Sequence, residues 1–229
     1  TRCLAAPEGA RHLVLFTYAP GAPLSWEAQG HSHLAGRLAA AIHGVSDSFV
    51  SQHSRSCLNL RHLIDDPLAA VRPFCDHRPE DWSRLEEFGG RLRTRLQAAA
   101  NAGLDWGVCH GNFNAENIHV TNDRQVTVFD FDLSGPGWRV SDFAEIRWDP
   151  RDRREMARWD SFLKGYTETR SLSAADVAAV PLFRAAARLF FFGLHAANAA
   201  RWGAWSMSDR YFDSELRFFR QWETEHPEG

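Results

Sequence analysis

The 229-residue sequence lacks the features of several protein classes. Its four cysteines form no Cys-x-x-Cys pair and its 11 histidines are scattered, so we expect no zinc site and predict free thiols in a reducing, cytoplasmic compartment. The longest apolar run, near Leu189–Leu194, is much too short to span a bilayer, and no signal peptide is visible, so we expect no membrane association. A net charge of −3 argues against a general nucleic-acid binder. What remains is the composition of an ordinary globular domain, with 44% hydrophobic residues.

The pattern of apolar and turn-forming residues predicts an α+β fold dominated by helices. Apolar residues recur at the 3.6-residue helical spacing from Trp82 to Leu96, within a helix predicted over 79–101. Two short β-like runs, at 106–109 and 125–129, follow it. The other expected elements are a strand over 11–18, a turn-rich hinge over 19–24, mixed structure over 44–77, and helices over 31–43, 153–167, 174–200 and 208–223.

Two polar clusters, each placed directly after a β-like run, carry the strongest functional signal. The first is His110-Gly111-Asn112, with Asn117 five residues later, and the second is Asp130-Phe131-Asp132. Each residue alone is explained by a turn, a cap or a strand end. Together they form the pattern of a phosphoryl-transfer site, which must hold metal ions against phosphates and orient an attacking hydroxyl.

The residue types fit that chemistry with one exception. Asn117 offers an amide oxygen and Asp130 a carboxylate, both hard ligands suited to Mg²⁺, and Asp132 is a candidate second metal ligand. Asn112 and His110 are the candidate catalytic residues, with position 112 orienting the acceptor and His110 fixing the loop through hydrogen bonds. An aspartate at 112 could accept the hydroxyl proton, whereas a neutral amide is no useful base.

With these motifs the chain resembles the aminoglycoside phosphotransferase and choline kinase-like superfamily, relatives of protein kinases, over roughly residues 12–225. The family signature is His-Gly-Asp-x-x-x-x-Asn followed by a strand that ends in Asp. Residues 135–144 are similar to the family's segment after the metal-binding Asp, which implies that Asp142 anchors the catalytic loop from below. Residues 194–203 look like the homoserine-kinase-like and stress-response-kinase branch. The resemblance implies a protein-kinase-like fold, ATP and Mg²⁺ as cofactors, and a hydroxyl-bearing acceptor.

The chain departs from that family at position 112 and in its N-terminal part. The family's N-terminal lobe should carry a glycine-rich loop, a strand lysine and a helix glutamate. No G-x-G-x-x-G occurs here, and the chain's single lysine, Lys164, lies in a predicted helix beyond the metal motif. The 25 arginines do not replace it, because none lies on a suitable strand before the hinge and the two side chains differ in phosphate geometry.

Residues 1–24 therefore resemble only the end of the N-lobe, its last strand and a nucleotide hinge at Phe16, Thr17 and Tyr18, while residues 25–229 resemble the C-lobe. We expect mainly the helical C-lobe, with a truncated or missing N-lobe. A sequence that is a piece of the whole protein is favoured over a natural protein without this lobe.

Two functions fit these observations. The first is ATP- and Mg-dependent phosphoryl transfer to a hydroxyl of a small molecule or of a Ser/Thr-type side chain. The alternative is a pseudokinase that binds a peptide or partner protein as a regulatory module, which Asn112 motivates. The sequence leaves the acceptor and the choice between ATP and GTP open.

Aromatic residues gather in the predicted C-terminal helices, and two interpretations fit them. The favoured one is that they pack the helices together, and the alternative is that some of them line an acceptor cleft over the catalytic loop. Arg139, Arg147 and Asp149 follow the metal segment and could face the acceptor, with solvent the favoured environment for the last two. The aromatic residues are Phe190, Phe191, Phe192, Trp202, Trp205, Tyr211, Phe212, Phe218 and Phe219.

Overall fold

The computed structural model describes residues 2–6, 9–144, 146, 152–203 and 207–227, with side chains from residue 14 onward. Its strands are β1 (Arg2–Ala6), β2 (Gly9–Leu13), β3 (Ala22–Pro23), β4 (Trp106–Cys109), β5 (Ile118–Val120), β6 (Val126–Val128) and β7 (Gly135–Trp138). Its α-helices are α1 (His31–Ser46), α2 (Asp66–Val71), α3 (Pro79–Asn101), α4 (Arg153–Thr167), α5 (Ala174–Ala197), α6 (Ala199–Trp202) and α7 (Asp209–Glu225). Short helical turns cover Arg61–Asp65, Arg72–Cys75, Ala115–Asn117, Phe131–Leu133 and Arg139–Phe143.

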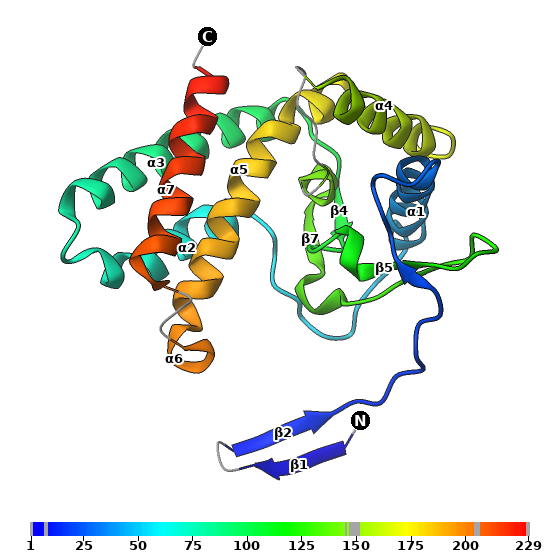
Figure 1. The fold of residues 1–229 in the computed structure, drawn as a ribbon, viewed down its shortest axis with the longest axis horizontal. Coiled ribbons are helices and arrows are strands. Elements are labelled where there is room, and N and C mark those ends of the chain that lie inside the picture. Colours follow the sequence, from blue (N-terminus) through cyan, green and yellow to red (C-terminus); the bar gives the residue numbers. More distant parts are fainter. Residues whose placement is uncertain (1, 7–8, 145, 147–151, 204–206, 228–229) are drawn as a thin grey trace.

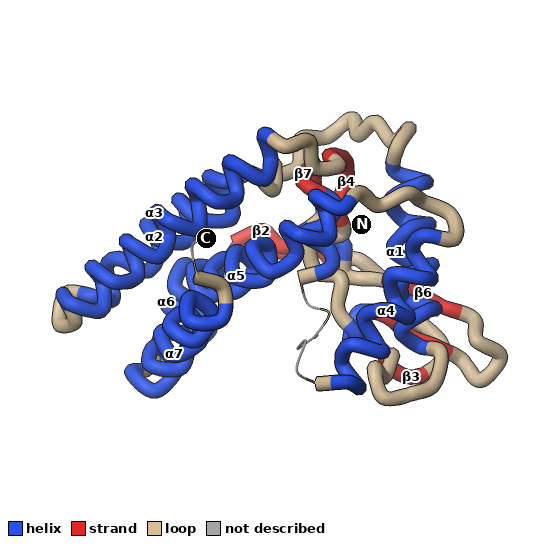
Figure 2. Tube along the Cα trace, turned by 90° about the horizontal axis from the view of Figure 1, so that it is seen from above, coloured by secondary structure: helices blue, strands red, loops and turns tan. Residues whose placement is uncertain are grey.

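The helices form two groups with the central strands between them (Figures 1 and 2). Helices α2, α3, α5 and α7 pack together on one side, and α1 packs along α4 on the other. The second pair approaches closely because glycines lie at the contact. A Cβ atom added to Gly36 would come within 2.0 Å of the Phe162 carbonyl oxygen, and one at Gly165 within 2.1 Å of the His33 carbonyl oxygen.

The three small sheets are antiparallel, and two of them position the polar clusters. Strand β4 pairs with β7, so that Cys109 lies opposite Gly135, and β5 pairs with β6, so that Ile118 lies opposite Val128. The first cluster follows β4 and the second follows β6. Strands β1 and β2 form a separate hairpin, joined to the rest of the chain by the irregular segment 14–20 (Figure 1).

Helix α5 is the centre of the larger helical group. Its buried residues Phe183, Leu189 and Phe192 belong to one core cluster with Phe88 of α3 and Phe212 of α7. The helix is long and apolar enough, by length and composition, to cross a membrane, and 44% of its most apolar stretch is buried inside the molecule. This is weak evidence for a membrane span, because a core helix passes the same test.

The expected α+β architecture is confirmed, with differences at element ends. The helices expected at 79–101 and 153–167 and the strand at 106–109 have the predicted bounds. The strand expected over 11–18 is wrong in position, because β2 ends at Leu13 and residues 14–20 form no regular structure. The helix expected over 174–200 divides at Asn198 into α5 and α6. The segment 61–75 is more helical than expected, because Pro67 and Pro73 stand in the first turns of α2 and of the turn Arg72–Cys75, where no backbone N–H is needed.

Candidate active site

His110 joins the two polar clusters. It is fully buried at the end of β4, and its Nε2–H donates to the carbonyl oxygen of Phe129 at 3.0 Å, with the tautomer assigned from these partners. Its Nδ1 accepts from the backbone N–H of Asn112 at 3.3 Å. Burial lowers the pKa of His110, so the imidazole is neutral at neutral pH. Both ring nitrogens are therefore used to shape the loop, as the sequence indicated.

Asp142 is the hydrogen-bond centre beneath this loop. Its buried carboxylate accepts from the backbone N–H of His110 and of Gly111, both at 2.8 Å. Gly111 has a φ of 80°, and a Cβ there would come within 2.3 Å of the carbonyl oxygen of Leu133. The bend of the loop thus depends on one glycine and one carboxylate.

Sequence reasoning missed a third partner of this carboxylate, His43 of α1. His43 is fully buried, its Nε2–H donates to Asp142 at 3.0 Å, and its Nδ1 accepts from the Tyr166 hydroxyl at 2.9 Å. Burial raises the pKa of Tyr166, so the hydroxyl keeps its proton. One sequence signal was available, since His43 falls on the buried face of α1 with Ala35, Ala39 and Ala40.

Asn112 lies between the two clusters. Its Nδ2 donates to Asp130 Oδ2 at 3.4 Å, and its Oδ1 accepts from Asn114 Nδ2 at 2.8 Å. The Asn117 side-chain amide donates to the Asn112 carbonyl oxygen at 2.9 Å. Asn114 also caps the turn Ala115–Asn117 by accepting from the backbone N–H of Glu116 and Asn117. These contacts bring the predicted residues 112, 117 and 130 together.

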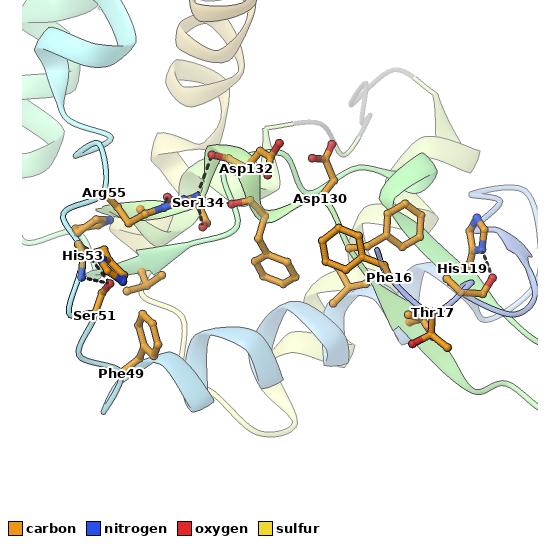
Figure 3. Close-up of a pocket in the computed structure, with 18 of the residues that line it drawn as sticks. Phe16, Thr17, Phe49, Ser51, His53, Arg55, His119, Asp130, Asp132 and Ser134 are labelled. Carbon is orange, nitrogen blue, oxygen red and sulfur yellow. Dashed lines mark hydrogen bonds between the residues drawn. The ribbon is translucent and has the colours of Figure 1, made fainter. Parts of the chain in front are cut away.

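Asp130 and Asp132 lie on an exposed turn after β6. Asp130 adopts the left-handed conformation, with φ of 67° and ψ of 55°, an uncommon one for a non-glycine residue. Arg55, which sequence reasoning missed, holds the turn by donating to the carbonyl oxygens of Phe131, Asp132 and Ser134 at 2.6–2.9 Å (Figure 3). Both carboxylates are exposed beside the same cavity.

The first cavity, of about 1750 Å³, lies beside this turn (Figure 3). The predicted hinge residues Phe16, Thr17 and Tyr18 line it together with Asp130 and Asp132. His119 of β5 fixes the neighbouring backbone, because its Nδ1–H donates to the carbonyl oxygen of Ala19 at 3.0 Å. The lining of the first cavity includes exposed apolar rings, among them Phe16 and Phe49.

The second cavity, of about 900 Å³, lies against the loop that contains Asn112. Asn112, Asn114 and Glu116 form its loop wall, and α5 and α7 form its helical wall. Glu116 lines both cavities, which places it at their boundary.

The aromatic residues of the C-terminal helices divide between the core and the lining of the second cavity. Phe192, Phe212 and Phe219 are buried in the core, while Phe190 packs on the ring of His62. The rings that line the second cavity are Phe191, Tyr211 and Phe218, and Trp202 packs edge-on against the ring of His195, which also lines it. Trp205 lies outside the described residues.

Arg139 faces neither cavity, so the expectation that it contacts the acceptor is wrong. Its buried guanidinium pairs with Asp47 at 2.5 Å and with Asp105 at 2.8 Å, and Arg170 pairs with the same two carboxylates. The side-chain hydrogen bond from Arg170 lowers the pKa of Asp47. This ion-pair cluster binds α1, β4 and the end of α4 together. Arg147 and Asp149 lie outside the described residues.

The donor set beside the first cavity fits a magnesium ion that phosphates help to bind. Within the described part of the chain no three His, Cys, Asp or Glu side chains form a metal cluster. Asp130 lines the first cavity and would supply a carboxylate. Asn117 would supply its amide oxygen, because its amide nitrogen donates to the carbonyl oxygen of Asn112. Mg²⁺ is commonly held by one or two such ligands together with water and substrate phosphates.

We predict that the fold loses stability as the pH falls from about 7.5 to about 5.5. Burial lowers the pKa of His62, His110 and His195, so the unfolded chain takes up protons that the folded chain does not. This contribution is complete above the ordinary histidine pKa and is lost as the pH falls below it. Burial raises the pKa of Glu215 and acts in the opposite direction.

Urea unfolding at several pH values measures this loss. Protonation of His110 Nδ1 removes the acceptor of the Asn112 N–H. His110→Gln should therefore be less stable than the natural chain near pH 7.5 and show a weaker pH dependence. A stability that stays constant or rises on acidification would contradict this account.

Comparison with known proteins agrees with this geometry. Residues 2–183 match the phosphotransferase enzyme family model, APH. An uncharacterized protein of Deinococcus radiodurans is 38% identical over 228 residues, which cover 97% of this chain and 66% of that protein. The chain thus spans slightly less than two thirds of that relative's length.

Two solved structures share the fold. A microcompartment-associated aminopropanol kinase has a TM-score of 0.75 at 21% identity, over 98% of this chain and 72% of that one. The amicoumacin kinase hAmiN, in complex with AMP-PNP, Ca²⁺ and Ami, has a TM-score of 0.63 at 18% identity, over 92% of this chain and 64% of that one. The expected kinase-like fold is therefore confirmed. Because the family model covers most of the described residues and the catalytic-loop motif lies within the match, this chain belongs to the phosphotransferase enzyme family.

Proposed function

We propose that the chain binds ATP with Mg²⁺ in the first cavity and places a hydroxyl-bearing small molecule in the second cavity for phosphoryl transfer. The main support for this proposal is the position of Asn112. It lines the second cavity and donates to Asp130, which lines the first. In a transfer site the phosphate donor and the acceptor must lie next to each other. Residue 112 is placed between them, because it lines one cavity and contacts a residue of the other.

Each predicted residue has a place in this proposal. Phe16, Thr17 and Tyr18 contact the nucleotide base side of the cavity. Asp130 and Asn117 hold the metal, with Asp132 as a candidate second ligand. A magnesium ion bound there would neutralise charge on the phosphates. The similar fold of hAmiN, whose structure contains AMP-PNP and Ca²⁺, supports nucleotide and divalent-metal binding.

The loop residues act by positioning. His110 and Asp142 fix the backbone that presents residue 112, through the hydrogen bonds at 2.8–3.3 Å. Asn112 can donate a hydrogen bond to the acceptor oxygen but cannot take its proton. Transfer through positioning alone is slow rather than absent, because the transition state of phosphoryl transfer is loose.

Asn112 also favours a second candidate function, a pseudokinase that binds nucleotide and a peptide or protein partner without transfer. Its amide already bonds with Asp130 and Asn114, so the loop is ordered without a general base. The two candidates agree on nucleotide binding and differ on turnover. Incubation with radiolabelled ATP and a panel of small alcohols separates them, since labelled product requires a kinase.

We predict that Asp130→Asn weakens magnesium-dependent ATP binding at least about tenfold, because a hard cation loses its carboxylate ligand. Asp132→Asn should have a smaller effect, because Asp130 is the carboxylate that contacts the loop through Asn112. Calorimetric titration with Mg-AMP-PNP measures both affinities. Equal affinities for Asp130→Asn and the natural chain would remove Asp130 from the metal site.

A further inference from the structure

The helical wall of the second cavity carries an excess of positive charge. Arg184 and Arg188 of α5 and Arg217 of α7 line it, against one carboxylate, Glu215. Glu116 also lines this cavity, but it lies on the loop wall, two residues after Asn114. It is therefore not counted with the helical wall. The charge that a bound molecule would meet along α5 and α7 is therefore positive.

Glu215 is not available to a ligand cation. Its side chain is 1% exposed, and its two oxygens accept from Arg188 Nε at 2.5 Å and Nη2 at 2.7 Å. This two-point contact uses the geometry in which a guanidinium binds a carboxylate best. An ammonium group would therefore meet no open carboxylate on this wall, and the exposed carboxylate of the cavity is that of Glu116 on the loop wall.

Two aromatic rings of this wall are already in contact with other side chains of the chain. The guanidinium of Arg188 lies over the ring of Phe218, 5.2 Å from its centre. The ring of Tyr211 stacks on His195, with 5.0 Å between ring centres. A cation binds proteins through open ring faces or carboxylates. On this wall, one face of Phe218 is covered by Arg188 and one face of Tyr211 by His195.

Two arginines complete the pattern. Arg217 is exposed and forms no ion pair with the residues that the structure describes. Arg184 precedes Arg188 by four residues on α5 and is partly buried beside the cavity. Guanidinium groups bind carboxylates and phosphates through paired hydrogen bonds.

We propose that the acceptor is a small hydroxylated anion, whose carboxylate or phosphate binds Arg184 and Arg217 while its hydroxyl faces Asn112. The proposal rests on the proposed function for the placement of the acceptor in this cavity. It distinguishes the chain from the aminopropanol kinase that shares its fold, which is named for an amino alcohol.

Four three-carbon alcohols of different charge test this proposal by calorimetric titration in the presence of Mg-AMP-PNP. They are glycerate and glycerol 3-phosphate as anions, glycerol as the neutral control and 1-amino-2-propanol as the cation. We expect the two anions to bind, and their comparison tells carboxylate from phosphate.

Arg184→Gln and Arg217→Gln should each weaken anion binding at least about tenfold. Arg220→Gln, an exposed change on α7 outside the cavity, is the matched control and should leave it unchanged.

Two results would overturn the proposal. One is tighter binding of 1-amino-2-propanol than of either anion. The other is anion binding that is absent, or that Arg184→Gln and Arg217→Gln do not weaken, in a chain that still binds Mg-AMP-PNP. Anion binding that depends on the arginines in a chain that binds no nucleotide would instead reject the proposed function and keep the ligand class.

Discussion

Asn112→Asp is expected to raise the rate of phosphoryl transfer by about 10²–10⁴-fold, the usual contribution of a positioned general base. The exchange replaces a neutral amide by a carboxylate at a residue that lines the second cavity and contacts Asp130 of the first. A carboxylate there can accept the hydroxyl proton, which the amide cannot. The rate is measured as radiolabelled phosphate transferred from ATP to the acceptor that binds best.

Asn114→Asp is the matched control for this change. It adds the same charge two residues along the same loop, and its carboxylate can still accept from the backbone N–H of Glu116 and Asn117. This control should not raise the rate. An Asn112→Asp chain that binds Mg-ATP and the acceptor but transfers no faster than the natural chain would show that residue 112 is not the base position.

The same substitution should make the chain more dependent on magnesium. Asn112 Nδ2 lies 3.4 Å from Asp130 Oδ2, so a carboxylate at 112 places two like charges side by side. Without a cation this repulsion destabilises the folded state, and a bound cation relieves it. Asn112→Asp should therefore unfold at a lower temperature than the natural chain in EDTA and recover part of the difference in Mg²⁺.

Asp142→Ala is expected to lower the free energy of unfolding by about 3–5 kcal/mol, because it leaves buried donors without an acceptor. The donors are the backbone N–H groups of His110 and Gly111 and the Nε2–H of His43. Urea unfolding near neutral pH measures the loss. Asp160→Asn, an exposed change on α4, is the control and should shift the stability by no more than about 0.5 kcal/mol.

A second variant separates the positioning of the loop from overall stability. Tyr166→Phe removes only the hydroxyl that donates to His43, at a cost of about 1 kcal/mol. It should leave nucleotide affinity unchanged where the fold is intact.

A stability loss below about 1 kcal/mol for Asp142→Ala would mean that the loop does not depend on this carboxylate.

The sequence predicted the part of the candidate site that is local in the chain. His110, Asn112 and Asn117 lie in one loop, and Asp130 follows the next hairpin, so two strands are enough to bring them together. The helices with strong apolar periodicity, such as α3, were predicted to the residue for the same reason. Local pattern and local geometry agree in these segments.

The parts that the sequence did not predict depend on contacts between distant residues. His43 lies 99 residues from Asp142, and Arg55 lies 76 residues from the Phe131 carbonyl that it binds. No periodicity carries such pairings. Arg139 was misplaced because its chain position, directly after β7, does not reveal that its side chain turns toward Asp47 and Asp105.

The helical wall of the second cavity is a further case of the same limit. Arg188 and Glu215 come from two helices, and only the packing of α5 against α7 shows that they pair. The same packing places Arg184 and Arg217 in the lining of one cavity. The sequence left open whether some C-terminal aromatic residues line a cleft or all of them pack in the core. It could not tell which rings face inward, because α5 and α7 are apolar over much of their length.

Thermal unfolding of this chain with and without saturating Mg-ATP tests the central claim, that the first cavity is a magnesium-dependent nucleotide site. A ligand that binds only the folded state raises its stability by about 2.7 kcal/mol at one hundred times the dissociation constant. We predict a clear upshift with Mg-ATP, a much smaller one with ATP in EDTA, and loss of the difference in Asp130→Asn. An unfolding temperature that Mg-ATP does not change, or that ATP raises equally without magnesium, would contradict the assignment.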